Sequence, residues 1–296
     1  MTTRPELDPK ILALYDSYVH GGISRRRFLE RVAGLATAGL SAAAVLASLS
    51  PDYALANQVA PDDGSITTDY KKYASPKGAG VMQGYFARPA VIDHKLPGVV
   101  VAHENRGLNP YIEDVTRRLA VAGFMAFAPD ALFPLGGYPG NDDDGRALQK
   151  QRDAREMFED FSAAVDYLSK HPDCSGQVGV TGFCFGGAIV LKLAVERPDL
   201  AAGVSFYGLH PAKQEARRIE APIMLHHAEL DDRVNASWPD FEAGLDAADK
   251  PYERFVYAGT SHGFHNDTTP RYDAEAAALA WQRTLGFFSG RLGLKV

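Results

Sequence analysis

The stretch TGFCFGG at residues 181–187 constrains the fold of this 296-residue chain more than any other. The short apolar run before it is typical of a buried strand, and residues 188–195 after it are typical of a helix. Glycines two before and two after Cys184 match the sharp strand-to-helix turn that presents a nucleophile. We therefore predict that Cys184 is such a nucleophile, with its pKa lowered by the helix N-terminus. The alternative interpretation is a buried structural cysteine in a Gly-rich turn.

Apolar strands alternate with helical segments from residue 66 onward. Residues 66–73 and 80–87 predict an antiparallel hairpin, and the continuous apolar run at 96–103 predicts a central parallel strand. Further strands are expected at 124–128, 202–207, 221–227 and 252–257, with helices at 109–122, up to about 170, and at 273–289, ended by Gly290. Residues 132–145 are expected to form a long loop. The pattern predicts one α/β domain with a doubly wound, mostly parallel sheet.

Charge and cysteine content exclude several classes of protein. The chain has a net charge of −6 and no extended basic patch, so we expect no nucleic-acid partner. Two cysteines, Cys174 and Cys184, are too few for a disulfide framework or a four-cysteine zinc site. We expect Cys174 to lie in a loop behind the strand, away from Cys184. We expect no cofactor and no metal, and either a monomer or a small homo-oligomer.

The N-terminal region has the order of an export signal. Residues 24–29, SRRRFL, are similar to a twin-arginine motif, an uncharged apolar run follows at 32–49, and Ala-Leu-Ala at 54–56 suits cleavage. We predict a signal segment at 1–56, a linker at 57–65, and a catalytic domain at 66–296. The protein would then be periplasmic or otherwise exported, with the twin-arginine machinery as a transient partner. The helical periodicity around 7–19 supports an alternative, an uncleaved N-terminal helix on a cytoplasmic protein.

Polar residues follow three of the expected strands, where parallel sheets form their sites. Cys184 follows one strand, Asp231 follows the strand ending at 227, and His262 follows the strand ending near 257. The order nucleophile, acid, base is that of the α/β-hydrolase fold. We predict that Cys184 attacks a carbonyl, His262 moves the proton and Asp231 orients His262, with Asp232 as the alternative acid.

An oxyanion needs hydrogen-bond donors beside the nucleophile. The N–H of Phe185 follows Cys184 directly, and a second N–H is expected from the loop after the central strand, most simply that of Asn105. Both donors are backbone groups, so the side chains at these two positions carry little information about the role.

The motifs together resemble those of the dienelactone hydrolase family. The resemblance covers most of residues 66–290 and rests on GFCFGG at 182–187, HENRGLN at 103–109, the loop from Asp231 to Val234, and HGF at 262–264. It implies hydrolysis of a small ester or lactone, as in a carboxymethylenebutenolidase, through a Cys-His-Asp triad and an acyl-cysteine thioester. It also implies that Glu104 helps generate the thiolate. Alternatively, Glu104 pairs with Arg106 and only positions the loop.

The chain departs from the family where the substrate carboxylate would bind. Family members that cleave dienelactone hold this group with two arginines, and Asn266 stands at one of those positions. An amide cannot make a charged bidentate contact. We assign substrate contacts to Arg106, Arg152 and Asn266, with Arg271 as the alternative for the missing arginine. The family's other arginine precedes the strand that leads to Cys184, where three candidates remain open: Arg146, Arg152 and Arg155. Hydrolase activity is therefore better supported than dienelactone specificity.

Two other functions fit the composition. A metal-dependent hydrolase would draw its ligands from five histidines, although none has the HExxH spacing: His103, His226, His227, His262 and His265. A non-catalytic protein that binds a small molecule on the same scaffold is the other alternative, because a fold does not fix a function.

Overall fold

An eight-stranded sheet forms the centre of the molecule in the computed structural model, which describes residues 8–35 and 41–294. The strands lie in the order β1-β2-β4-β3-β5-β6-β7-β8. Their bounds are β1 Ile66–Ser75, β2 Gly80–Pro89, β3 Leu96–Ala102, β4 Met125–Pro129, β5 Cys174–Phe183, β6 Ala202–Phe206, β7 Ile223–Ala228 and β8 Tyr252–Tyr257. The pairs β1–β2 and β2–β4 are antiparallel and the remaining pairs are parallel. The predicted α/β-hydrolase fold with an N-terminal hairpin is confirmed.

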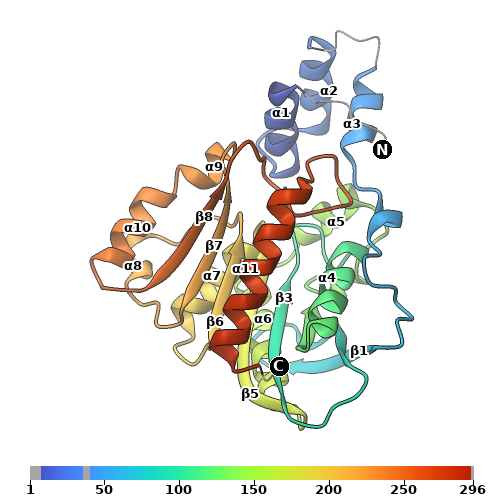
Figure 1. Ribbon diagram of the computed structural model, residues 1–296. Coiled ribbons are helices and arrows are strands. Elements are labelled where there is room, and N and C mark those ends of the chain that lie inside the picture. The colour runs from blue at the N-terminus through green and yellow to red at the C-terminus, as the bar shows by residue number, and fades with distance from the viewer. Residues whose placement is uncertain (1–7, 36–40, 295–296) are drawn as a thin grey trace.

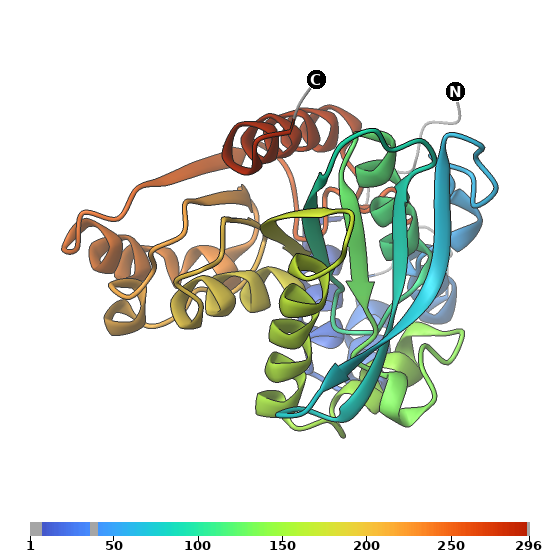
Figure 2. The ribbon, with the colours of Figure 1, turned by 90° about the horizontal axis from the view of Figure 1, so that it is seen from below.

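Helices cover both faces of this sheet (Figures 1 and 2). On one face lie α4 (Pro110–Val121) and α11 (Ala274–Leu292), and on the other lie α6 (Ala154–Ser169), α7 (Phe185–Glu196) and α10 (Trp238–Asp246). Two short helices, α8 (Lys213–Ala216) and α9 (Asp232–Asn235), join the later strands. The central strands are therefore buried on both sides, which explains why their sequences are continuously apolar.

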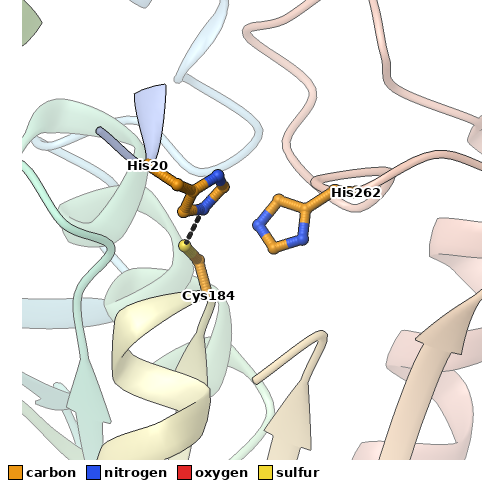
Figure 3. Close-up of side chains that lie close together, drawn as sticks. All are labelled: His20, Cys184 and His262. Carbon is orange, nitrogen blue, oxygen red and sulfur yellow. Dashed lines mark hydrogen bonds between the residues drawn. The ribbon is translucent and has the colours of Figure 1, made fainter. Parts of the chain in front are cut away.

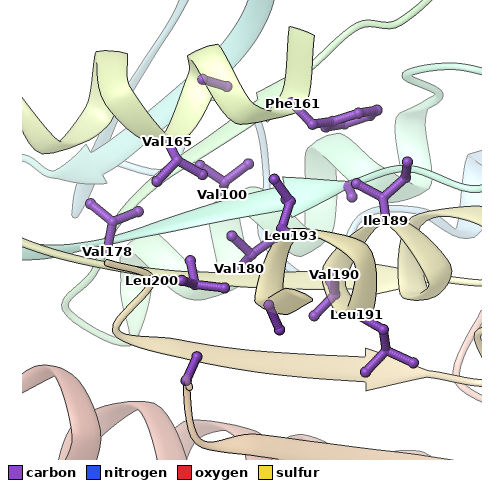
Figure 4. Packing of buried hydrophobic residues seen from close by; sticks show 14 of the residues in the cluster. Val100, Phe161, Val165, Val178, Val180, Ile189, Val190, Leu191, Leu193 and Leu200 are labelled. Carbon is purple, nitrogen blue, oxygen red and sulfur yellow. The ribbon is translucent and has the colours of Figure 1, made fainter. Parts of the chain in front are cut away.

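Alternate residues of the central strands enter two separate cores. Val100, Val178 and Val180 pack with α6 and α7 in one core, as Figure 4 shows, whereas Val99 and Val101 pack under α4 and α11. Because successive side chains on a strand point to opposite faces, one short run of valines supplies both cores. This packing fixes the strand ends that carry the polar loops.

Three local predictions need correction. Residues 132–145 include a short turn of helix, η2 (Phe133–Leu135), and the start of α5 (Asp142–Gln149). Asn141 caps α5 by accepting from the Asp144 N–H, and three aspartates in its first turn complement the helix dipole. Gly293, with φ of 70°, ends α11 in place of Gly290. Cys174 begins β5, so the ten-residue strand holds it roughly 30 Å from Cys184, too far for a disulfide.

The N-terminal region forms a helical unit at one end of the molecule (Figure 1). Its helices are α1 (Pro9–Val19), α2 (Arg25–Ala33) and α3 (Ala42–Leu49), followed by the turn η1 (Tyr53–Leu55). Tyr15, Phe28, Val32, Val45 and Leu49 are among the buried residues of a separate small core between these helices. We refer to the described residues from 8 to 56 as the N-terminal cap. None of the described helices has both the length and the apolar character needed to cross a membrane.

Candidate active site

The turn at Cys184 has the strained geometry predicted from its glycines. Cys184 lies between β5 and α7 with φ of 58° and ψ of −112°, a conformation that non-glycine residues rarely adopt. A Cβ atom on Gly186 would lie 2.0 Å from the Ala102 carbonyl oxygen, and one on Gly182 would lie 2.4 Å from the Gly186 oxygen. The close approach of backbone on both sides therefore requires glycine at these two positions.

His262 and Asp231 meet at the same edge of the sheet. The Nδ1 atom of His262 lies 2.5 Å from Oδ2 of Asp231, and the Val234 N–H donates to the other carboxylate oxygen. Nδ1 therefore carries the proton that faces the carboxylate, which leaves Nε2 toward Cys184. That Nε2 atom is buried without a hydrogen-bond partner among the described residues. Asp232 instead begins α9 and is exposed, so the geometry favours Asp231 over Asp232 as the predicted acid.

A second histidine, which the sequence did not indicate, contacts Cys184. The Nε2 atom of His20, directly after α1, lies 3.1 Å from the Cys184 Sγ atom (Figure 3). Its Nδ1 atom faces two acceptors of Asp16, the backbone oxygen at 2.8 Å and Oδ1 at 3.1 Å. His20 lies within residues 1–56, which the sequence indicates as a removable signal, so no pattern there pointed to a catalytic role.

The charges around Cys184 favour a thiolate. Burial would raise the pKa of the Cys184 thiol, but the nearby His20 and His262 charges hold that pKa well below its ordinary value. Burial likewise opposes the charge on His262, and Asp231, Cys184 and Asp16 overcome it and raise the pKa of His262 to about 10. The pKa of His20 is also raised against burial, mainly by the charge on Cys184 and by Asp16. An ion pair between a thiolate and imidazolium groups is a nucleophile prepared for attack.

Glu104 lies beside the site but is held by other partners. Its Oε2 atom is 2.8 Å from Nη2 of Arg106 and accepts from the Asn266 side chain at 3.1 Å. The Cys184 sulfur contacts Nε2 of His20 rather than Glu104 among the described residues. The structure therefore shows the pairing of Glu104 with Arg106 that was the alternative to thiolate generation.

The arginines assigned to the substrate are buried in ion pairs. Arg106 also pairs with Asp142, and Arg152 pairs with Asp160 at 2.7 Å and with the backbone oxygen of Ala131. Both guanidinium groups are held by carboxylates, although Nε of Arg106 has no hydrogen-bond partner among the described residues, and these ion pairs support the loops that surround the site. These ion pairs give Arg106 and Arg152 a role in holding the loops, and their assignment to substrate binding stays a prediction. Asn266, which bonds to Glu104, holds the same loop network.

The predicted oxyanion loop contacts the N-terminal cap. The side chain of Asn105 donates to the backbone oxygen of Val19 at 2.8 Å. Phe185 is the first residue of α7, where backbone N–H groups have no acceptor within the helix. A helix N-terminus at this place would stabilise negative charge on a carbonyl oxygen.

A cavity of about 560 Å³ opens between α1 and the loops that carry Asp231 and His262. This is an ordinary size for a small-molecule site. Arg271 lines it, stacks over the Tyr15 ring and has two nitrogens, Nε and Nη1, that are buried without hydrogen-bond partners among the described residues. A smaller cavity of about 250 Å³ lies on the Asn105 side of His20. His20 therefore borders both spaces.

One group of side chains has the types needed for a metal. Ligand atoms of His20, Cys184 and His262 lie within 4.8 Å of one another. The guanidinium of Arg233 lies 3.1 Å from the same Nε2 atom of His20, which opposes a second cation there. Four of the five histidines considered for a metal are instead hydrogen-bonded to protein groups: His103, His226, His227 and His265.

Comparisons with known proteins agree with this geometry. The model of the dienelactone hydrolase family matches residues 82–292, and a model described as YqhI-like matches residues 1–37. The chain is 56% identical over 114 residues to the hydrolase fragment YghX of Escherichia coli K12, covering 38% of this chain and 97% of that one. It is 32% identical to an E. coli K12 relative named carboxymethylenebutenolidase, over 74% of this chain and 86% of the relative.

A solved structure gives the same result for the fold. The dienelactone hydrolase-like promiscuous phosphotriesterase P91 from metagenomic libraries is 27% identical, with a TM-score of 0.66 over 78% of this chain and all of that one. The family match spans most of the sheet and every loop that carries Cys184, Asp231 and His262. The chain is therefore a member of the dienelactone hydrolase family and a hydrolase of the ester or lactone kind.

Proposed function

We propose that the protein hydrolyses a small ester or lactone with Cys184 as nucleophile, His262 as the proton carrier and Asp231 as its partner. The observation that carries the proposal is the placement of Cys184 at a strained turn, beside a histidine whose other nitrogen is fixed by a buried carboxylate. Such a constellation is recognised by its geometry and its roles.

The proposed reaction has two steps. The Cys184 thiolate attacks the carbonyl carbon and a C–S bond forms, while the N–H groups of Phe185 and Asn105 stabilise the oxyanion. The ester C–O bond breaks as His262 gives its proton to the leaving oxygen, which leaves a thioester on Cys184. Neutral His262 then takes a proton from water as the water attacks the thioester. The C–S bond breaks, the carboxylic acid product leaves, and the Cys184 thiolate and the His262 imidazolium are regenerated.

Arg271 narrows the class of substrate. Arg271 lines the cavity beside His262, and two of its guanidinium nitrogens are buried without hydrogen-bond partners among the described residues, so a carboxylate that reached them would offset their burial. The relative named carboxymethylenebutenolidase suggests a lactone that carries a carboxylate. We propose that Arg271 supplies the charged contact that Asn266 cannot make.

We also propose export through the twin-arginine machinery, with the N-terminal segment retained. Arg25, Arg26 and Arg27 are exposed on α2, where a receptor could reach them. Retention is supported by the contacts of the cap with the site, because cleavage after Ala56 would remove His20. Fractionation of the native host, combined with the intact mass of the protein, tests both parts. A periplasmic protein lacking residues 1–56 would refute retention.

The experiment for the main proposal compares the full chain with Cys184→Ala and, as a matched control, Cys174→Ala. A short-chain nitrophenyl ester and a carboxylated lactone serve as substrates, with and without a chelator. We expect Cys184→Ala to lower kcat/KM on the order of 10³-fold or more, and Cys174→Ala to have little effect. Equal activity of wild type and Cys184→Ala would refute the proposal, and loss of activity with the chelator would favour the metal-dependent alternative. A wild-type chain that binds both substrates without turnover would indicate a binding protein.

A further inference from the structure

The N-terminal cap reaches the reacting sulfur. Contacts along its length join it to the catalytic domain: the Asp52 N–H donates to the Thr268 oxygen at 2.8 Å, and the Tyr53 hydroxyl donates to Asp142 at 2.8 Å. Together with the contact between Asn105 and Val19, these bonds hold the end of α1 over Cys184. A spacer or a removable signal segment would not require a histidine in contact with the Cys184 sulfur.

We propose that His20, held in place by Asp16, is a second catalytic histidine that the N-terminal cap supplies to stabilise the Cys184 thiolate before attack. The inference rests on the proposed function, because it takes Cys184 to be the nucleophile. It goes further in making the cap part of the catalytic centre, with a histidine outside the Cys184-His262-Asp231 triad.

The orientation of the His20 ring supports this role. Two acceptors on Asp16 face Nδ1, so Nδ1 carries a proton in either charge state, and Nε2 is the atom turned to Sγ. When Nε2 is also protonated, it donates to the thiolate. His20 is the C-cap of α1, and the dipole at a helix C-terminus favours a positive charge there. The fold thus holds a cationic imidazole against the sulfur.

The charged groups around His20 are balanced when the sulfur is ionised. Cys184, Asp16 and Asp231 supply three negative charges. His20, His262 and Arg233 supply three positive ones, with Arg233 Nη2 lying 3.1 Å from His20 and 3.5 Å from His262, and Arg233 Nε lying 3.5 Å from Asp16. Protonation of the thiolate would leave a net positive charge in a site that is largely buried, which is unfavourable. Arg233 opposes a full charge on His20, and Asp16 offsets it.

The contact between His20 and the sulfur belongs to the resting state. When the thiolate attacks, the negative charge moves to the carbonyl oxygen, and the sulfur of the thioester is neutral. The attraction between His20 and the sulfur then ends. Because His20 borders both cavities, a substrate that spans them lies against this ring. His20 therefore acts on the population of thiolate, whereas His262 moves the proton during the reaction.

Alkylation of Cys184 measures this thiolate without any substrate. Rates with iodoacetamide are recorded against pH for the full chain in a Cys174→Ala background, with the variants His20→Gln and Asp16→Asn. His94→Gln, at a half-buried histidine between β2 and β3, is the matched control. An opposite charge at this distance lowers a pKa by about 1–3 units. We expect the profile of His20→Gln to move up by about one pH unit or more, which lowers the rate at least roughly 10-fold on the acid side. Asp16→Asn should shift it in the same direction by less.

Several results would overturn the proposal. An unshifted profile in a folded His20→Gln protein would make His20 a structural contact only. If His20→Gln fails to fold, the alkylation profile of Asp16→Asn is used instead. An unshifted profile in Asp16→Asn would likewise make His20 a structural contact only. A shift in His20→Gln with unchanged kcat/KM across the same pH range would show that the thiolate population does not limit catalysis. Hydrolysis that survives Cys184→Ala would refute the proposed function itself, which the alkylation profile does not test.

Discussion

Gly186→Ala tests the geometry on which the site depends. The new Cβ would lie 2.0 Å from the oxygen and 2.5 Å from the carbon of the Ala102 carbonyl, and 2.7 Å from the His103 oxygen. All three atoms are backbone, so no flexible side chain can move aside. The end of β3 and the loop that carries Asn105 must shift instead, by about 1 Å for a normal contact distance of roughly 3 Å or more.

The expected loss of stability follows from this displacement. Overpacking that side chains can absorb costs about 1–3 kcal/mol, and a rigid backbone contact at this distance should exceed that range. For a chain of this size, a loss of about 3 kcal/mol lowers Tm by about 6 °C. The same shift should also disturb the oxyanion loop, so kcat/KM should fall by more than the stability loss alone explains.

Gly290→Ala is the matched control. Gly290 lies within α11, is exposed, and has no atom within 4 Å of the added Cβ. The change should stabilise the protein by about 0.5–1 kcal/mol and leave activity unchanged. Thermal unfolding and ester hydrolysis are measured for both variants. A Gly186→Ala protein that unfolds within about a degree of wild type and keeps full activity would refute the reasoning.

Three further predictions concern charged groups of the site. Asp231→Asn should lower kcat/KM by about 10²-fold or more and bring the pKa of His262 down from about 10, whereas Asp232→Asn should have a much smaller effect. Both effects are measured from pH–rate profiles. Equal effects of the two variants would contradict the choice of Asp231 as the acid. Because the folded-state pKa of His262 is raised, its stabilisation of the fold is complete below about pH 6.5 and is lost as pH rises through about 10. Denaturant unfolding across this range should therefore show a fall in the free energy of unfolding that is smaller in His262→Gln, and an equal fall in both proteins would contradict this linkage. Arg271→Gln should raise KM about 10-fold for a carboxylated lactone and leave KM for a neutral ester unaffected. The control Arg155→Gln, at a surface arginine, should keep the wild-type KM for both substrates in steady-state kinetics. An equal rise in KM for both substrates in Arg271→Gln would exclude a carboxylate contact.

Local sequence patterns predicted the parts of the site that local geometry determines. The spacing of glycines around Cys184 reports the crowding of its turn, and the positions of Asp231 and His262 after strands report the edge of a parallel sheet. These signals are contained in short windows, so they can be recognised without knowledge of the tertiary structure.

The remaining parts depend on contacts between distant segments. His20 and Cys184 are 164 residues apart, and His20 lies in the stretch that the sequence pattern predicts to be an export signal. Arg106 is next to the predicted oxyanion residue, yet its guanidinium turns to Glu104 and Asp142. No pattern within a short window specifies such a partner. The run of acidic residues at 142–144 did contain a usable signal, because Asn141 before it is a favourable N-cap.

Trapping of the acyl-enzyme tests the central claim most directly. The full chain is mixed with a short-chain nitrophenyl ester, quenched in acid within the first turnovers, digested and examined by mass spectrometry. We predict that the acyl group is found on the peptide that contains Cys184, and that its amount increases in His262→Gln, where water attack on the thioester is slowed. Rapid hydrolysis with no adduct on Cys184 in either protein, together with full activity of Cys184→Ala, would contradict the proposed mechanism.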